Sequence, residues 1–261
     1  MSAPSPTSDG EAPIRISGLR TAFGKKVIHE NLDLEVRKGE ILGVVGGSGS
    51  GKSVLLNTIL GLKHPDGGTV EIFGRRIDDP DARSAVERRI GVMFQQGALF
   101  SFLTVQENVE TPLLEHARLP RDFVRDLARL KIALAGLPDN AGSLKPAELS
   151  GGMRKRAGVA RAIALDPDIL FLDEPTAGLD PIAASEFDAL VTTLRQALGL
   201  TVFMITHDLD TLYAICDRVA VLAEKKIVAV ATIDELERSD HPWIKRYFLG
   251  PRGRAVQKKV R

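Results

Sequence analysis

The chain has 261 residues, 44% of them hydrophobic, which is enough for one α/β core with a smaller satellite, and no internal repeat indicates a second copy. The net charge is +1, but the last 17 residues hold seven Lys or Arg and no Asp or Glu, so the preceding 244 residues carry −6. A body of that sign argues against nucleic acid as a partner.

No apolar run approaches the ~18 residues that a membrane helix needs, and the first residues lack the basic and apolar regions of a signal peptide. We expect residues 1–13 to be a disordered segment of a soluble protein that is not exported. Any membrane path would then belong to another polypeptide. The single cysteine, Cys216, lies in an apolar helical stretch, which favours a buried small hydrophobe over a redox or metal role and fits a cytosolic compartment.

The first motif is a glycine-rich run between a predicted buried strand at 41–45 and a predicted buried helix at 54–60. The run fits the pattern G-x-x-x-x-G-K-[ST] and consists of Gly46, Gly47, Ser48, Gly49, Ser50, Gly51, Lys52 and Ser53. Such a turn presents backbone N–H groups to a polyphosphate at a helix N-terminus. Lys52 would place its charge on the outer phosphates, and the Ser53 hydroxyl suits Mg²⁺ coordination. The alternative is a merely flexible loop between two core elements.

Residues 97–165 have a mainly helical pattern, and within them a short motif precedes one helix. Ser150 is a good helix N-cap, and Gly151 and Gly152 leave the amides of the first turn uncovered. The helix dipole favours an anion at that end. The alternative is an ordinary capped helix packed by Val159 and Ile163 together with Leu165.

Two carboxylates follow the next predicted strand, a continuous apolar run at 169–172 that is typical of an interior parallel strand. Asp173 and Glu174 would stand at its carboxyl end, where open α/β sheets bind their ligands. Asp173 is then the expected Mg²⁺ partner, and Glu174 the expected general base for an attacking water. A solvated acidic loop is the alternative. A further strand predicted at 201–205 is followed by His207.

These motifs resemble those of the ATP-binding cassette (ABC) family from about Ile14 to about Leu236, and the run from Leu149 to Met153 is similar to its LSGGQ signature with Met in place of Gln. The resemblance implies an α/β P-loop NTPase fold over residues 14–240. A RecA-like core, an antiparallel β subdomain and a helical subdomain at about 97–165 make up that fold. It also implies an ATP-driven dimer, in which Ser150 to Gly152 of one subunit close on the nucleotide of a second copy.

Other positions match the family one at a time. Phe23 occupies the place of the aromatic that stacks on adenine. Gln95 resembles the Q-loop glutamine that touches Mg²⁺ and the membrane partner, with Gln96 as the open alternative. Asp180 resembles the D-loop aspartate and would cap a helix that begins with Pro181, while His207 resembles the switch histidine that senses the γ-phosphate. The resemblance thus predicts ATP contacts along residues 46–53 and at Phe23, Val54, Ser150, Gly151, Gly152 and Asp180, Mg²⁺ contacts at Ser53, Gln95 and Asp173, and catalysis by Glu174, His207 and Gln95.

Two classes of function fit the family, a transporter ATPase and a soluble ABC ATPase of DNA repair or translation. The chain lacks the long coiled-coil insertion of repair members and the second cassette of translation members. Several segments between residues 96 and 116, and residues 244–250, resemble the cassette of the bacterial Mla lipid transporters, with another ABC importer or exporter as the alternative. That resemblance implies a phospholipid cargo, an integral permease facing residues 104–109, an MCE-domain lipid-binding protein and a small STAS-domain subunit. The chain would then lie peripherally on the cytoplasmic face of the bacterial inner membrane.

The last segment, 241–261, is basic and begins with an apolar cluster that includes Trp243, Ile244, Tyr247, Phe248 and Leu249. Aromatic residues at this density favour docking, and we expect the segment to fill a groove on the second cassette or an accessory subunit. Attraction of its seven basic residues to an anionic leaflet is the rival interpretation.

Overall fold

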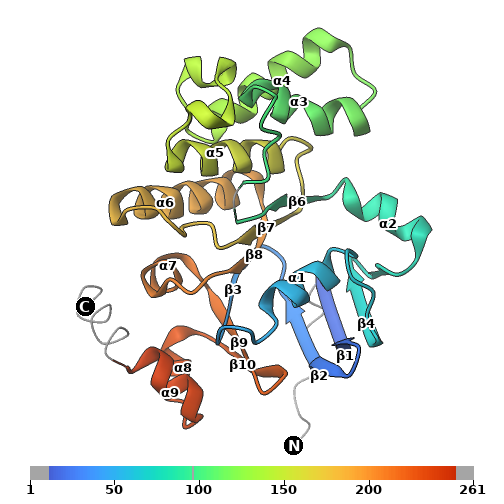
Figure 1. The fold of residues 1–261 in the computed structure, drawn as a ribbon, viewed down its shortest axis with the longest axis vertical. Coiled ribbons are helices and arrows are strands. Elements are labelled where there is room, and N and C mark those ends of the chain that lie inside the picture. The colour runs from blue at the N-terminus through green and yellow to red at the C-terminus, as the bar shows by residue number, and fades with distance from the viewer. Residues whose placement is uncertain (1–11, 96, 251–261) are drawn as a thin grey trace, which may run out of the picture.

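The computed structural model describes residues 12–95 and 97–250, and it divides into two sheets and a helical lobe (Figure 1). The larger sheet has six strands in the order β10-β9-β3-β8-β7-β6. Its strands are β3 (Ile41–Gly46), β6 (Ile90–Met93), β7 (Ile169–Asp173), β8 (Thr201–Ile205), β9 (Arg218–Ala223) and β10 (Lys226–Ala231). All pairings are parallel except that of β10 with β9. The carboxyl ends of β3, β7 and β8 therefore meet at one edge.

The smaller sheet is antiparallel, in the order β2-β1-β4-β5. Its strands are β1 (Ile14–Phe23), β2 (Lys26–Val36), β4 (Gly67–Ile72) and β5 (Arg75–Arg76), and helix α2 (Pro80–Glu87) follows them. Ile14 and Ile16 alternate with exposed Arg15, as expected of a sheet with one covered face. Of the segment 1–13 that the sequence predicts to be disordered, residues 1–11 lie outside the described residues, and the Pro13 carbonyl accepts a hydrogen bond from the Phe73 amide (2.9 Å).

The helical lobe lies at one end of the molecule (Figure 1) and falls within residues 97–165. It contains α3 (Val105–His116), α4 (Arg121–Leu134), α5 (Gly151–Ala162) and two short 3₁₀ segments, Asp139–Ser143 and Pro146–Glu148. Thr104 begins α3 with a capping box, because its hydroxyl accepts from the Glu107 amide while the Glu107 carboxylate accepts from the Thr104 amide. Val109, Ile132 and Ala157 help to form a core that belongs to the lobe itself.

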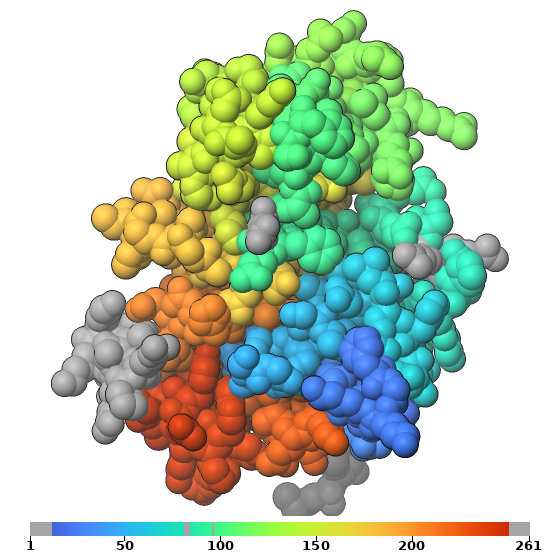
Figure 2. Space-filling view, in the orientation of Figure 1, coloured from blue at the N-terminus to red at the C-terminus, as the bar shows by residue number. Residues whose placement is uncertain are grey.

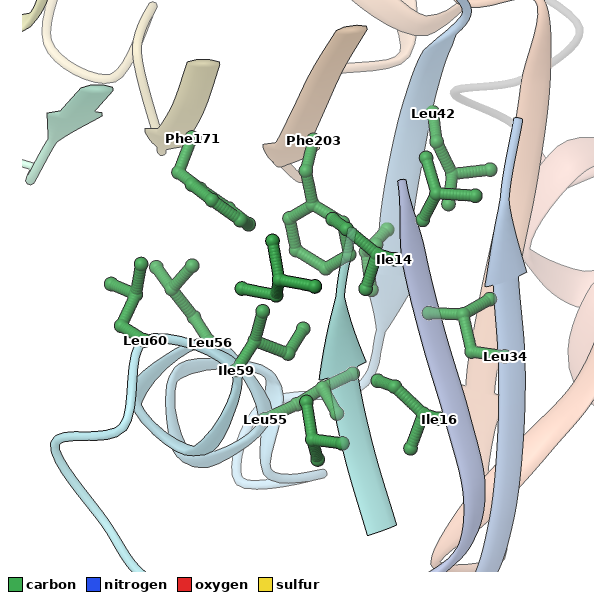
Figure 3. Close-up of a cluster of buried hydrophobic side chains, with 14 of the residues drawn as sticks. Ile14, Ile16, Leu34, Leu42, Leu55, Leu56, Ile59, Leu60, Phe171 and Phe203 are labelled. Atoms are coloured by element: carbon green, nitrogen blue, oxygen red, sulfur yellow. The ribbon is translucent and has the colours of Figure 1, made fainter. Parts of the chain in front are cut away.

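Helix α1 (Lys52–Ile59) packs its apolar face between the two sheets (Figure 3). Leu55, Leu56 and Ile59 contact a cluster that also holds Ile14 of β1 and Phe203 of β8. Burying three such side chains removes enough apolar surface to stabilise the fold by roughly 5 kcal/mol or more. The loop in front of α1 is therefore anchored to both sheets.

The predicted elements around the motifs are confirmed. Strands predicted at 41–45, 169–172 and 201–205 are β3, β7 and β8, each extended by one residue at most. The helix predicted at 54–60 begins two residues earlier, because Gly51 occupies its N-cap position with φ 104°. Cys216 follows α7 (Leu209–Ile215), and burial raises the pKa of its thiol, in agreement with a packing role.

The remaining helices are α6 (Pro181–Leu198), α8 (Ile233–Glu237) and α9 (Pro242–Phe248). The docking hypothesis for the C-terminal aromatic cluster is wrong for Ile244 and Phe248, which are 1% and 0% exposed inside this chain's own core. In Figure 2 the red surface near the C-terminal end of the described chain lies directly against orange surface from the segments before it. Residues 251–261, with most of the basic charge, lie outside the described residues. In the described part of the chain, no helix combines the length and apolar character needed to cross a membrane.

Candidate active site

The glycine-rich loop connects β3 to α1 at the carboxyl edge of the larger sheet. Only glycine fits at position 51, for two reasons. A Cβ there would stand 2.6 Å from Nε2 of His29 on β2, and the φ of Gly51 is in the left-handed region. Lys52 folds back over the loop, and its ammonium donates to the carbonyls of Gly46 (2.8 Å) and Gly47 (3.4 Å). Burial lowers the pKa of Lys52, and the negative charges of Glu174 and Asp173 oppose part of this downward shift.

The two predicted carboxylates stand at the end of β7, next to this loop. Burial, and then the charge of Glu174, raise the pKa of Asp173, while Lys155 and Lys52 lower it. The direction is upward, so burial together with the neighbouring carboxylate outweighs the two lysines in this half-buried place. Ser53 is an exposed residue at the start of α1. This edge therefore brings hard oxygen donors together, the ligand type that a divalent cation prefers.

Glu174 and His207 are brought together from β7 and from the loop after β8. His207 Nδ1 and Glu174 Oε2 lie 2.7 Å apart, and the Glu174 side chain is only 15% exposed while that of His207 is 67% exposed. The backbone of Glu174 has φ 48°, a conformation that costs a non-glycine residue about 1 kcal/mol. A hydrogen bond from its amide to the Ile205 carbonyl (2.8 Å) holds it there. The backbone of Glu174 is thus held by the end of β8.

The motif at Ser150 begins α5 as predicted. The Ser150 hydroxyl accepts from the Met153 amide (3.2 Å), which confirms the N-cap. A Cβ on Gly152 would meet nothing within 4 Å, and one on Gly151 would meet only Leu179 Cδ2 at 3.8 Å. Val159 and Ile163 are buried, so the helix is also packed as expected of the alternative, an ordinary capped helix. A capped and packed helix with an uncovered N-terminus satisfies both interpretations. In Figure 1, α5 lies among the helices of the lobe and α1 lies beside the smaller sheet.

The other predicted positions lie at the edges of this region. Phe23 is 59% exposed at the end of β1, with the Lys63 ammonium 5.1 Å from its ring centroid. Gln95 is exposed after β6, and its alternative Gln96 lies outside the described residues. Asp180 caps α6 as expected, accepting from the amides of Ile182 and Ala183 at 3.0 Å each.

Lys155, on α5, is a site residue that the sequence reasoning missed. Its buried ammonium donates to the carbonyl of Gln95 and to that of Glu174 (3.0 Å). Desolvation lowers the pKa of Lys155, and the charges of Asp173 and Glu174 oppose that shift. Spacing could have found it, since Lys155 precedes the core residue Val159 by four positions and so shares the inward face of the helix.

Comparison with known proteins agrees with this geometry. The family model described as "ABC transporter" matches residues 29–177. The "Intermembrane phospholipid transport system ATP-binding protein MlaF" of Haemophilus influenzae is 38% identical over 239 residues, 91% of this chain and 90% of the relative. The "Probable ribonucleotide transport ATP-binding protein mkl" of Mycobacterium bovis is 36% identical over 251 residues, 94% and 70% of the two chains.

Solved structures of the cassette MJ0796 share the fold. Its dimeric structure, "a Bacterial ABC Transporter Cassette", has a TM-score of 0.77 and 31% identity, covering 84% of this chain and 98% of the other. A second dimeric structure of MJ0796, a post-hydrolysis state bound to ADP and Pi, has a TM-score of 0.76 and 30% identity, with the same coverage. The chain therefore belongs to the ABC transporter family, as one of its ATP-hydrolysing cassettes.

Proposed function

We propose that ATP is hydrolysed at the edge formed by β3, β7 and β8. The observation that carries this proposal is the 2.7 Å contact between Glu174 and His207. An ionised carboxylate can only accept, so Nδ1 of His207 carries the proton, and its Nε2, when protonated, can donate to a phosphate oxygen. Glu174 would accept the proton of the attacking water as a general base.

The remaining roles follow from position. The loop amides and Lys52 would hold the phosphates, Phe23 the adenine, and Ser53, Gln95 and Asp173 a Mg²⁺ ion. When bound, such an ion would supply positive charge that neutralises the charge developing on the phosphates. The exposed N-terminus of α5, from Ser150 to Gly152, would complete the nucleotide site of a second copy, with Asp180 beside it. The dimeric MJ0796 structures support such a pair.

Replacing Glu174 tests the catalytic proposal. Glu174→Gln keeps an acceptor for His207 but removes the base, so we expect turnover to fall ~10²–10⁴-fold. ATP affinity should stay unchanged, and ATP should hold the dimer on size-exclusion chromatography. Glu35→Gln is the control, because the exposed Glu35 pairs with Arg15 on the smaller sheet (3.3 Å). Turnover of Glu174→Gln within a few-fold of the parent would remove Glu174 from this role.

We further propose that the cassette powers a phospholipid transporter from the cytoplasmic face of the bacterial inner membrane. The relative named for intermembrane phospholipid transport supports this cargo, while the relative named for ribonucleotide transport supplies the competing one. Phe102 is 70% exposed and Phe100 lies 5.9 Å from it, ring to ring, just before α3. This apolar pair beside residues 104–109 would receive an integral permease. An MCE-domain protein and a STAS-domain subunit are the further proposed partners.

The cargo can be tested in proteoliposomes that contain the native complex. We expect ATP-dependent movement of labelled phospholipid between vesicles, none with Glu174→Gln, and no accumulation of labelled ribonucleotide. Ribonucleotide uptake without lipid movement would overturn the lipid proposal and leave the ATPase proposal intact. Mass spectrometry of the purified complex would show whether the permease and the two accessory subunits accompany the chain.

A further inference from the structure

Helix α9 packs against the two elements that carry the nucleotide-binding loops. Its buried residues Ile244 and Phe248 share a core cluster with Val45 of β3 and with Leu209 and Leu212 of α7. Strand β3 leads into the phosphate loop, and α7 begins directly after His207 and Asp208. The C-terminal helix therefore lies behind both sides of the active site, although it is more than thirty residues from the nearest motif in the sequence.

Tyr247 reaches from α9 to the loop between β8 and α7, which carries His207 and is called the switch loop below. Its hydroxyl donates to the His207 carbonyl at 3.2 Å. Burial raises the pKa of Tyr247, and the charges of Glu174 and Asp208 raise it further. The phenol thus lies close enough to the catalytic carboxylate to respond to its charge, and it remains a neutral hydrogen-bond donor at physiological pH.

Trp243 extends the same contact to the phosphate loop. Its ring stacks on that of Tyr247, with centroids 4.8 Å apart and planes 12° from parallel, and the Tyr247 ring meets Phe248 edge-on at 5.1 Å. The indole Nε1 lies 3.8 Å from the place that a Cβ on Gly47 would occupy. One stacked pair thereby extends from beside Gly47 in the glycine-rich loop to the backbone of His207 in the loop after β8.

We propose that α9 is a clamp on the active site, in which Tyr247 and Trp243 are positioning residues for His207 and the phosphate loop. The proposal rests on the proposed role of His207. The imidazole is mostly exposed, so its direction depends on the Glu174 contact and on where the backbone of the loop is held. The Tyr247 hydroxyl donates a hydrogen bond to the His207 carbonyl and so fixes the backbone of that loop. The Trp243 indole, stacked on Tyr247, sets the position of the loop relative to Gly47.

The first test removes a single hydroxyl. Tyr247→Phe keeps the stacking on Trp243 and the packing on Phe248, and loses only the bond to His207. Because one net hydrogen bond corresponds to about a three- to tenfold effect, we expect kcat to fall by that factor while KM for ATP and the melting temperature stay near the parent. Tyr213→Phe is the matched control, since its hydroxyl donates to Glu237 (2.6 Å) within the same cluster. A kcat of Tyr247→Phe equal to that of Tyr213→Phe would overturn the clamp.

A double-variant cycle separates this proposal from the one on which it rests. If His207→Ala leaves turnover unchanged, the proposed role of His207 fails, whatever Tyr247 does. If His207→Ala is slow, Tyr247→Phe should add no further loss in that background. An independent loss there would show that Tyr247 does not act through His207 and would overturn the clamp alone.

The second test uses the chain's only tryptophan, Trp243. In the full chain carrying Glu174→Gln, which should bind ATP without consuming it, we expect ATP with Mg²⁺ to shift or quench the indole emission. Adenosine, which lacks phosphates and would reach only the Phe23 end, should leave the emission unchanged. An unchanged spectrum at saturating ATP, with binding verified by calorimetry, would contradict the contact between the phosphate loop and α9.

Discussion

Lys155 shows how one residue can tie three motifs together. It stands five positions after Ser150, and its ammonium binds the carbonyls of Gln95 and Glu174. In the proposed dimer the N-terminus of its helix serves the partner's nucleotide, while Glu174 serves the chain's own. Lys155 would thereby connect the two nucleotide sites through a single side chain.

We predict that Lys155→Met lowers both activity and stability. The substitution keeps the length of the side chain but leaves two carbonyls without their donor, and an unsatisfied buried group costs about 1–3 kcal/mol. Turnover should fall about tenfold because Gln95 and Glu174 lose their common anchor. Steady-state kinetics and urea unfolding measure the two effects. Arg129→Met, at an exposed position on α4, is the control, and a Lys155→Met protein indistinguishable from it would refute the anchor.

At the scale of single residues, the sequence predicts those roles that depend only on neighbouring positions in the chain. Ser150 and Asp180 cap the helices expected of them, because capping depends on the next three residues. The pairing of Glu174 with His207 required the register of β7 beside β8, which joins residues more than thirty positions apart. Lys155 was missed since a lysine in a basic run is ordinarily a solvated surface charge.

At the scale of elements, α5 combines a buried face with an N-terminus that the described residues leave largely uncovered. A side chain at Gly151 meets only Leu179, at an ordinary contact distance. An acidic residue in the first turn also agrees with the helix dipole. Substitution at Gly151 should therefore leave the monomer folded and act only on what approaches this end of the helix.

We predict that Gly151→Asp blocks ATP-dependent dimerisation while the lone subunit still binds nucleotide. The added carboxylate would face the γ-phosphate held by the second copy, and like charges repel. Gly151→Asn has nearly the same size without the charge, so its dimerisation should be clearly less impaired. Analytical ultracentrifugation with ATP in a Glu174→Gln background compares the two. Normal dimers of the Asp variant would mean that the nucleotide site does not span two chains.

Helix α9 lies in the segment that the sequence analysis expects to dock on a neighbouring chain. Trp243 and Tyr247, like Ile244 and Phe248, are spaced four apart, which is typical of a helix with an apolar face. That spacing does not identify the surface covered. Ile244 and Phe248 share a core cluster with Val45, almost two hundred residues earlier, and so fill the chain's own core where the sequence suggested a groove on a neighbour.

At the scale of the whole molecule, the active site depends on how the two sheets meet. Sequence patterns predicted the buried strands and the helix after the glycine-rich loop, because periodicity is a local property. They could not predict that β2 runs beneath this loop. There Ile28 and His29 of β2 lie against Gly51, which explains the glycine at that position.

His29 makes the packing of the smaller sheet against the glycine-rich loop sensitive to acid. It is fully buried, with Nδ1 2.7 Å from Thr21 Oγ1. Burial lowers its pKa to about 4, and the charge of Lys63 adds to the shift. Asp188 shifts in the opposite direction, since burial raises its pKa to about 7. A pH profile of the parent alone would therefore mix opposing contributions to the free energy of unfolding.

We predict that His29 makes the protein lose stability as the pH falls from about 6.5 to about 4. In that range the unfolded chain binds a proton at His29 and the folded chain does not, so acid favours unfolding, by on the order of 3 kcal/mol over the whole window. Urea unfolding at pH 7.5 and 5.0 should show that His29→Gln, though less stable at pH 7.5, loses less on acidification than the parent. The contribution of Asp188 cancels in this difference. His64→Gln, at an exposed position, should lose as much as the parent. Equal losses for all three proteins would mean that His29 is protonated in the folded state and does not link the phosphate loop to pH.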